Sequence, residues 1–271
     1  MRRITAVLSA MLLLLVVGCG SDANAAERIA AAPEITSEGG SARMAMKMTM
    51  AGGAQNIEMT AEGAVEFATQ RGTMTMDMGA ATEQMGGKIE MITDGSTIYM
   101  KMPNAEQLGL KTPWMKMDMD ALTGTPGMGN LQQLNNDPSN SMQLLRGVAD
   151  DVEEVGTEEL RGAQTTHYKA TIDLNKALEE APKDAQEYLR QQFETAGITQ
   201  LPVDVWIDDE GRMRRQSFEM DLSKIEGADA PGAPTSMTLD MELFDFGAPV
   251  DVKPPPAKDV TDFADIQGAG G

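Results

Sequence analysis

The sequence predicts an α+β fold in which a strongly curved antiparallel sheet, a half-barrel of about nine to eleven strands, wraps two or three helices. Three observations predict it. Apolar and polar residues alternate over many short segments, Gly-containing turns separate these segments, and only a few stretches have a helical pattern. Short turns join antiparallel neighbours, so a parallel doubly wound sheet is excluded.

The N-terminus has the pattern of a bacterial lipoprotein signal. Two basic residues precede an apolar run over residues 6–17, which is too short to span a bilayer, and Cys19, the only cysteine, follows closely. We expect residues 1–18 to be a signal peptide. Cys19 would then carry a diacylglyceryl group that anchors the exported protein on the extracytoplasmic face of the cell membrane. The alternative is a secretory signal cleaved after Ala25, which would discard Cys19.

The net charge of the protein restricts the classes of partner that it can bind. The sequence has 22 Lys and Arg against 42 Asp and Glu; Arg2 and Arg3 leave with the signal, so 20 basic residues remain and the net charge is −22. Nucleic acid is excluded, because phosphate binding needs a basic surface. Anionic headgroups repel such a body, so the lipid anchor has to supply membrane attachment.

Composition divides the mature chain into three regions. Residues 19–40 are expected to form the lipidated N-terminus, a tether and a short helix that is interrupted near Pro33. Residues 41–250 form a single domain, and residues 251–271 form an extended tail rich in Pro and Gly. Because one cysteine cannot form an internal disulfide, the domain depends on its apolar core, for which its length suffices.

The first half of the domain is predicted to be a meander of sequential antiparallel strands. The residues that alternate with a period of two lie in 44–50, 59–67, 74–78, 98–102 and 115–119. Turn signals separate these runs. The clearest is Asp94-Gly95, which predicts a two-residue hairpin loop.

The second half adds helices to the sheet. One or two short helices are expected within residues 130–147, and a longer one over Asn175–Ala196, which ends at Gly197. Further strands are predicted at 152–155, 165–174, 201–207, 213–222 and 236–246. The helices are expected to lie on the concave side of the sheet.

Methionine is the second informative feature of the composition, with 23 Met against six Phe, two Trp and three Tyr. Because Met is unbranched and polarizable, a face lined with it adapts to apolar guests of different shapes. We therefore predict a hydrophobic cavity that binds an apolar acyl lipid or glycolipid. The expected lining residues are Met44, Met46, Met48, Met50, Met59, Met74, Met76, Met78, Met100, Met102, Met115, Met117, Met119, Met237, Leu239 and Met241.

The methionines also allow two different roles. They can fill an ordinary dry core, or their thioethers can bind Cu(I) in an exported copper-handling protein. Against copper, Leu239 and Leu243 alternate with Met237 and Met241 as if the two residue types were exchangeable, and same-face neighbours lie about 7 Å apart along a strand. We expect no cofactor and no metal. A lipoprotein that acts on another envelope protein, without a ligand, is a further possibility.

Four segments resemble the actinobacterial LppX/LprA/LprF/LprG lipoproteins and related LolA-like proteins. They are Gly162–Asp173, Leu201–Asp208, Gly211–Arg215 and Phe246–Val252. The resemblance implies a half-barrel sheet that wraps helices around a hydrophobic cavity, and a role in binding or carrying acylated lipids or glycolipids across the cell envelope. The Met-rich strands depart from this family, in which more Val, Leu and Phe are expected.

Catalysis is not expected. His167 is the only histidine, and the alternation of its strand places it on the face opposite Tyr168. No G-x-S-x-G motif or phosphate loop is present, and Cys and His are too few for a zinc site. The acidic runs at 150–154 and 208–210 lack the spacing of an EF-hand and are interpreted as solvated turns.

One hairpin combines an aromatic residue with several cations. Trp206 is interpreted as a packing residue, and Arg212, Arg214 and Arg215 as a solvated basic edge. The alternative is that these cations meet an anionic headgroup.

Overall fold

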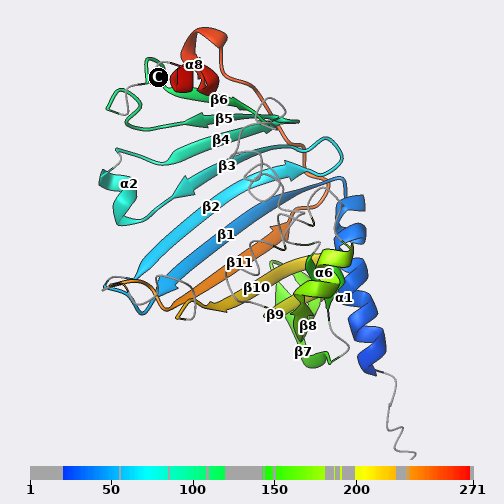
Figure 1. Ribbon diagram of the computed structural model, residues 1–271. Helices are drawn as coiled ribbons and strands as arrows, with labels where there is room; N and C mark the ends of the chain where they lie inside the picture. Colours follow the sequence, from blue (N-terminus) through cyan, green and yellow to red (C-terminus); the bar gives the residue numbers. More distant parts are fainter. Residues whose placement is uncertain are drawn as a thin grey trace, which may run out of the picture.

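Strands make up nearly half of the described residues, and all twelve belong to one sheet in the computed structural model (Figure 1). The strands are β1 Ser41–Ala51, β2 Ile57–Glu66, β3 Arg71–Asp77, β4 Ile89–Asp94, β5 Thr97–Lys101, β6 Trp114–Asp118, β7 Glu153–Leu160, β8 Ala163–Asp173, β9 Gln200–Asp208, β10 Met213–Asp221, β11 Ser236–Phe244 and β12 Val260–Asp262. The helices are α1 Ser21–Glu38, α2 Ala80–Gln84, α6 Leu174–Glu180 and α8 Phe263–Gly268, with 3-10 turns η1 Leu144–Gly147 and η2 Ala257–Asp259.

The structure describes residues 21–54, 56–84, 86–107, 110–119, 142, 144–148, 151–180, 186, 190, 199–223, 230 and 232–268. The predicted signal peptide and Cys19 lie outside these residues. So do most of the helices predicted within 130–147 and over Asn175–Ala196, of which the structure describes mainly η1 and α6.

The sheet consists of two meanders that meet in its middle. The strand order is β12-β6-β5-β4-β3-β2-β1-β11-β10-β9-β8-β7, and every pair except β12–β6 is antiparallel. The chain runs outward from β1 to β6, then inward from β7 to β11, which pairs with β1. The predicted curved antiparallel sheet is confirmed, as Figure 1 shows.

Two local predictions differ from the structure. The sheet has twelve strands rather than nine to eleven, because β4 and the three-residue β12 were not anticipated. The hairpin loop is Gly95-Ser96 rather than Asp94-Gly95, since Asp94 pairs with Thr97. Gly95 occupies the left-handed region at φ +62°, which suits a residue without Cβ.

The N-terminal region is more ordered than predicted. α1 runs without interruption through Pro33 to Glu38, where a tether and a shorter helix were expected. The tertiary structure holds the segment beyond the proline: the Thr36 hydroxyl donates to the Ala32 carbonyl at 2.6 Å and accepts the Met213 backbone N–H at 2.8 Å. Anchoring to β10 thus offsets the cost of an internal proline.

The C-terminal region also differs from the predicted extended tail. After β11 the chain passes the ends of the strands, where the Ser41 hydroxyl donates to the Ala248 carbonyl at 2.7 Å. It then adds β12 parallel to β6, and α8 follows (Figure 1). The hydroxyls of Thr112 and Thr261 lie 2.6 Å apart at this junction. β12 therefore covers the edge of the sheet that β6 would otherwise expose.

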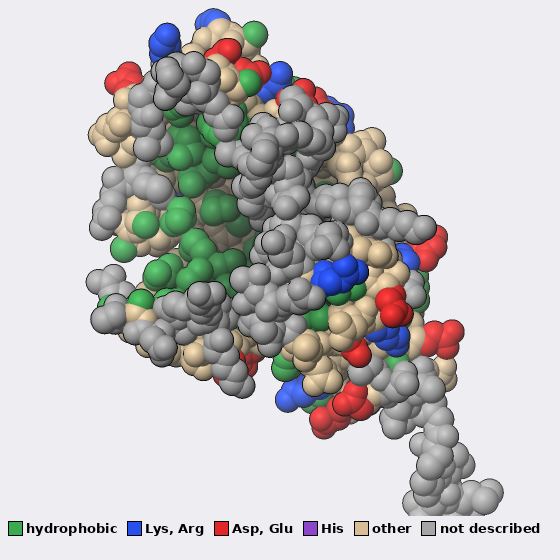
Figure 2. All heavy atoms as spheres, viewed as in Figure 1, with side chains coloured by type: hydrophobic (Ala, Val, Ile, Leu, Met, Phe, Trp, Pro, Cys, Tyr) green, Lys and Arg blue, Asp and Glu red, His purple; other side chains and the backbone are tan. Residues whose placement is uncertain are grey.

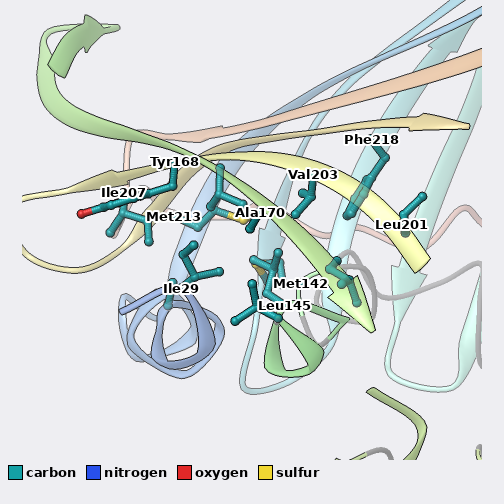
Figure 3. Close-up of a cluster of buried hydrophobic side chains, with 14 of the residues drawn as sticks. Ile29, Met142, Leu145, Tyr168, Ala170, Leu201, Val203, Ile207, Met213 and Phe218 are labelled. Carbon is teal, nitrogen blue, oxygen red and sulfur yellow. The ribbon is translucent and has the colours of Figure 1, made fainter. Parts of the chain in front are cut away.

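The main core lies where α1, η1 and α6 pack on the sheet near β8, β9 and β10. In Figure 3, Ile29 of α1 and Leu145 of η1 point toward the strands, which supply Tyr168 and Val203. Ile29 and Leu145 are 0% exposed and Tyr168 is 1% exposed. This dry core stabilises one half of the sheet.

Candidate functional site

One face of the sheet collects the predicted methionines. Directly opposite residues of an antiparallel pair point to the same face. Leu243 lies opposite Met44, Met44 opposite Gly63, and Gly63 opposite Met74. Followed across the sheet, this register places thirteen of the sixteen predicted residues on one face, and Met78, Met102 and Met119 directly follow β3, β5 and β6.

This face, which we call the concave face, includes residues that the sequence did not single out. Met91 of β4 lies between Met74 and Met100, and Met220 of β10 lies opposite Met237. β4 was missed because Ile92 faces the other side, so Met91 and Ile92 form an apolar pair without clear alternation. The Gly86-Gly87 turn and the later hairpin bracket the strand and were the available signal.

The concave face has two halves that differ in burial. In the closed half, β7–β11, the helices cover the sheet, and Ile172 and Val205 are 0% exposed. In the open half, β2–β6, the methionines of this face are only partly buried, among them Met74, Met91 and Met100, whereas Ala61, Val65 and Ile98 are buried. β1 lies between them, with Met44 buried and Met50 partly exposed.

The open half forms a hollow lined with apolar atoms. Figure 2 shows hydrophobic side chains gathered inside this hollow, whereas the charged side chains in that view lie around it. Partly exposed apolar side chains gathered in one hollow are typical of binding sites. The role of the methionines as lining residues of a ligand site remains a prediction.

A separate groove of about 670 Å³ lies beside the end of the concave face. α1 contributes Glu34 and Glu38, η1 contributes Arg146, and Phe67 and Ala68 follow β2. Because charged side chains of both signs line it, this groove does not match the apolar cavity predicted from the methionines.

Trp206 lies on the opposite, convex face of the sheet and is a packing residue, as predicted. The His167 ring stacks on Trp206, with centroids 4.2 Å apart and planes inclined by 7°, and the Arg215 guanidinium lies 4.6 Å from the Trp206 ring. Asp204 Oδ1 lies 2.5 Å from His167 Nε2, and Asp240 accepts from Arg215 at 2.7 Å. His167 thus faces away from Tyr168, as predicted, and is held in a structural stack.

In the turn between β9 and β10, the interpretation of the acidic run as solvated is confirmed for the exposed Asp209 and Glu210 but is wrong for Asp208. Asp208 is 4% exposed and accepts from the backbone N–H groups of Glu210 and Arg212. Its carboxylate also lies 3.0 Å from Arg212 Nε and 3.5 Å from Arg214 Nη1. Two of the three arginines considered for an anionic headgroup, Arg212 and Arg214, therefore already have a carboxylate partner, and both also lie over the ring of Phe246.

Within the described residues, no group of three or more His, Cys, Asp or Glu side chains is placed to hold a metal ion. None of the described helices combines the length and the apolar character that crossing a bilayer requires. One carboxyl group is clearly perturbed: hydrogen bonds from Lys88, Thr82 and the Gly79 N–H lower the pKa of Asp77 below its ordinary value of 3.8.

Known proteins share part of this sequence and its fold. No model of a known protein family matches it. An uncharacterized 31.2 kDa protein of Streptomyces griseus is 27% identical over 158 residues, 57% of this chain and 48% of that protein. A provisionally named lipoprotein of Streptomyces coelicolor is 28% identical over 171 residues, 62% of this chain and 48% of that protein. The chain thus spans about half the length of these curated relatives.

A solved structure supports the predicted resemblance. The crystal structure of the Mycobacterium tuberculosis lipoprotein LppX matches with a TM-score of 0.52 and 18% identity, covering 86% of this chain and 100% of that one. At this identity the likeness establishes the fold. The chain therefore has the LppX fold that the four sequence segments predicted.

Proposed function

From the LppX fold and the apolar hollow, we propose that this protein is a membrane-anchored extracytoplasmic lipoprotein that binds or carries an acyl-chain lipid or glycolipid. The observation that carries the proposal is the open half of the concave face, where aligned methionines remain partly exposed. Partly exposed methionines leave apolar surface in contact with water, which is unfavourable. An acyl chain bound in the hollow would cover this surface, and each of its own methylenes that becomes buried would contribute about 0.8 kcal/mol to binding. Flexible Met side chains adapt to chains of different length.

The position of α1 supports close attachment of the domain to the membrane. α1 begins at Ser21, two residues after Cys19, and Ala25 is already buried against the domain. Two extended residues span about 7 Å at most, so a lipid on Cys19 would hold the domain close to the bilayer. This replaces the long tether expected from residues 19–40.

The test adds one charge to either face of the open half. Met91→Lys places an ammonium group on the concave face, whereas Thr75→Lys places it on the convex face, where Thr75 is exposed and lies opposite Glu62 and Glu90. Both variants are made in the purified Cys19→Ser chain, and binding of a fluorescent fatty-acyl probe is titrated. We expect Met91→Lys to weaken probe binding by about tenfold or more and Thr75→Lys to leave it unchanged.

Absence of probe binding to the parent chain, together with native mass spectra free of co-purified lipid, would contradict the proposal. It would favour a lipoprotein that acts only on another envelope protein. Equal losses in both variants would show that the concave face is not the site.

The anchor is tested separately. Mass spectrometry of the N-terminal peptide is expected to find a diacylglyceryl group on Cys19, and Cys19→Ala is expected to move the protein out of the membrane fraction. We propose no catalytic activity, since His167 and Asp208 are occupied in structural contacts.

A further inference from the structure

The open half contains an uninterrupted row of four methionines. Met74 lies directly opposite Met91, Met91 opposite Met100, and Met100 opposite Met115, on the adjacent strands β3, β4, β5 and β6. The neighbouring rows mix residue types. Met76 lies opposite Ile89, for example, and Ile98 lies between Thr93 and Met117.

Methionines on adjacent strands are close enough to bind one ion, although same-face neighbours along a single strand are not. Same-face residues along one strand are about 7 Å apart, whereas directly opposite residues have Cβ atoms about 5 Å apart. The three rotatable bonds of each Met side chain then allow sulfurs from adjacent strands to converge on one point. Three neighbouring sulfurs of the row can bind one ion, and the fourth sulfur offers an alternative ligand.

The chemistry of the row selects the kind of ion. All four side chains are thioethers, and all are only partly buried, so an ion can reach them from the hollow. The row itself contains no carboxylate, imidazole or thiolate. Thioethers are soft ligands that favour Cu(I), while Mg²⁺ and Ca²⁺ need oxygen donors.

We propose that Met74, Met91, Met100 and Met115 form a binding site for one Cu(I) ion. The site shares the concave face with the proposed lipid site but does not depend on it. Uptake of the acyl probe tests the proposed function, and copper binding tests this one, so either can fail alone.

The test is an anaerobic titration of the purified Cys19→Ser chain with Cu(I) in competition with a chromogenic Cu(I) chelator; the Cys19 substitution removes the one thiol. The parent chain is expected to bind one equivalent tightly. Replacing Met74, Met91 and Met100 together by Leu keeps the volume but removes three sulfurs. We expect the dissociation constant to rise at least about 100-fold, since even outer-shell changes weaken metal sites by up to that factor.

The matched control replaces three other methionines of the same face by Leu. In the paired strands, Met46 lies opposite Met241, and Met48 lies opposite Met59, so these rows place methionines side by side in pairs rather than in fours. This variant, with Met46, Met48 and Met59 replaced, is therefore expected to bind Cu(I) like the parent. Thermal unfolding of both variants checks that they are folded. Equal weakening in the two triple variants would overturn the proposal.

Methyl resonances identify the ligands directly. In a chain labelled with ¹³C at the methionine methyl groups, the first equivalent of Cu(I) is expected to shift the signals of at least three of the four row residues. A shorter row, Met50, Met237 and Met220, crosses β1, β11 and β10. First-equivalent shifts in that row, shifts spread over all the methionines, or no binding would each overturn the proposal.

Discussion

The two halves of the concave face follow the same alternation but use different residues. Where α1, η1 and α6 cover the sheet, many inward positions of β8 and β9 are aromatic or β-branched, such as Tyr168, Ile172 and Val205. Where the face is hollow, methionine is the most frequent inward residue, as at Met74 and Met91. Branched and aromatic side chains have few rotamers and fit fixed partners, whereas Met fits partners that vary. Composition along this face thus differs between the buried core and the surface that we propose binds a ligand.

Loss of the buried ion pair in the closed half is expected to have the largest effect on stability. Asp208→Ala leaves Arg214, itself 9% exposed, without the carboxylate 3.5 Å from its Nη1 and removes the oxygen that accepts two backbone hydrogen bonds in the β9–β10 turn. We expect the free energy of unfolding to fall by about 3–5 kcal/mol. Urea denaturation measures it, with Asp209→Ala in the same turn as the control.

Core truncation in the same half is expected to cost nearly as much. Ile172 is 0% exposed, so Ile172→Ala creates a cavity and should reduce the free energy of unfolding by about 2–5 kcal/mol. A loss below about 1 kcal/mol in urea denaturation would show that the closed half is not a dry core.

The same kind of truncation in the open half should cost much less. Met91→Ala removes a partly exposed side chain, and we expect a loss below about 1 kcal/mol. Measured alongside Ile172→Ala, it contrasts the two halves with one kind of substitution. Equal losses at the two positions would contradict the distinction between the halves.

The sequence predicts the central strands better than it predicts the edge strand β12 or the length of α1. The Met44–Met50 alternation predicted β1, because a period of two is a local property. β12 was missed, since Val260–Asp262 has no pattern and pairs through a distant parallel contact with β6. α1 was predicted too short because its end depends on Thr36 bonding to β10.

The candidate site was only partly predictable for a related reason. Alternation shows that Met74 and Met100 each lie on an apolar face, but not that Met91 stands between them. That fact depends on the register of two successive hairpins, which the turns fix. The burial of Asp208 likewise depends on Arg214 and the neighbouring Phe246 rather than on its acidic surroundings.

The smallest expected effect is the contribution of Asp77, in the open half, to the pH dependence of stability. Because the folded-state pKa of Asp77 lies below 3.8, its ionised form stabilises the fold above about pH 3.8, and this contribution is lost as the pH falls through the folded pKa. Asp77→Asn should therefore lower stability slightly at pH 7 and not at pH 2. Unfolding curves at the two pH values measure this; a difference that persists at pH 2 would exclude the carboxylate as its cause.

The open half, and not the closed half, is proposed to receive the acyl chain, and photo-crosslinking can locate that chain on the protein. The purified Cys19→Ser chain is loaded with a diazirine-labelled fatty acid, irradiated, digested and mapped by mass spectrometry. We expect labels on the concave residues of β2–β6, with Met74, Met91 and Met100 among them. Labels confined to the convex face or to the groove beside Arg146, or no labels at all, would contradict the proposed site.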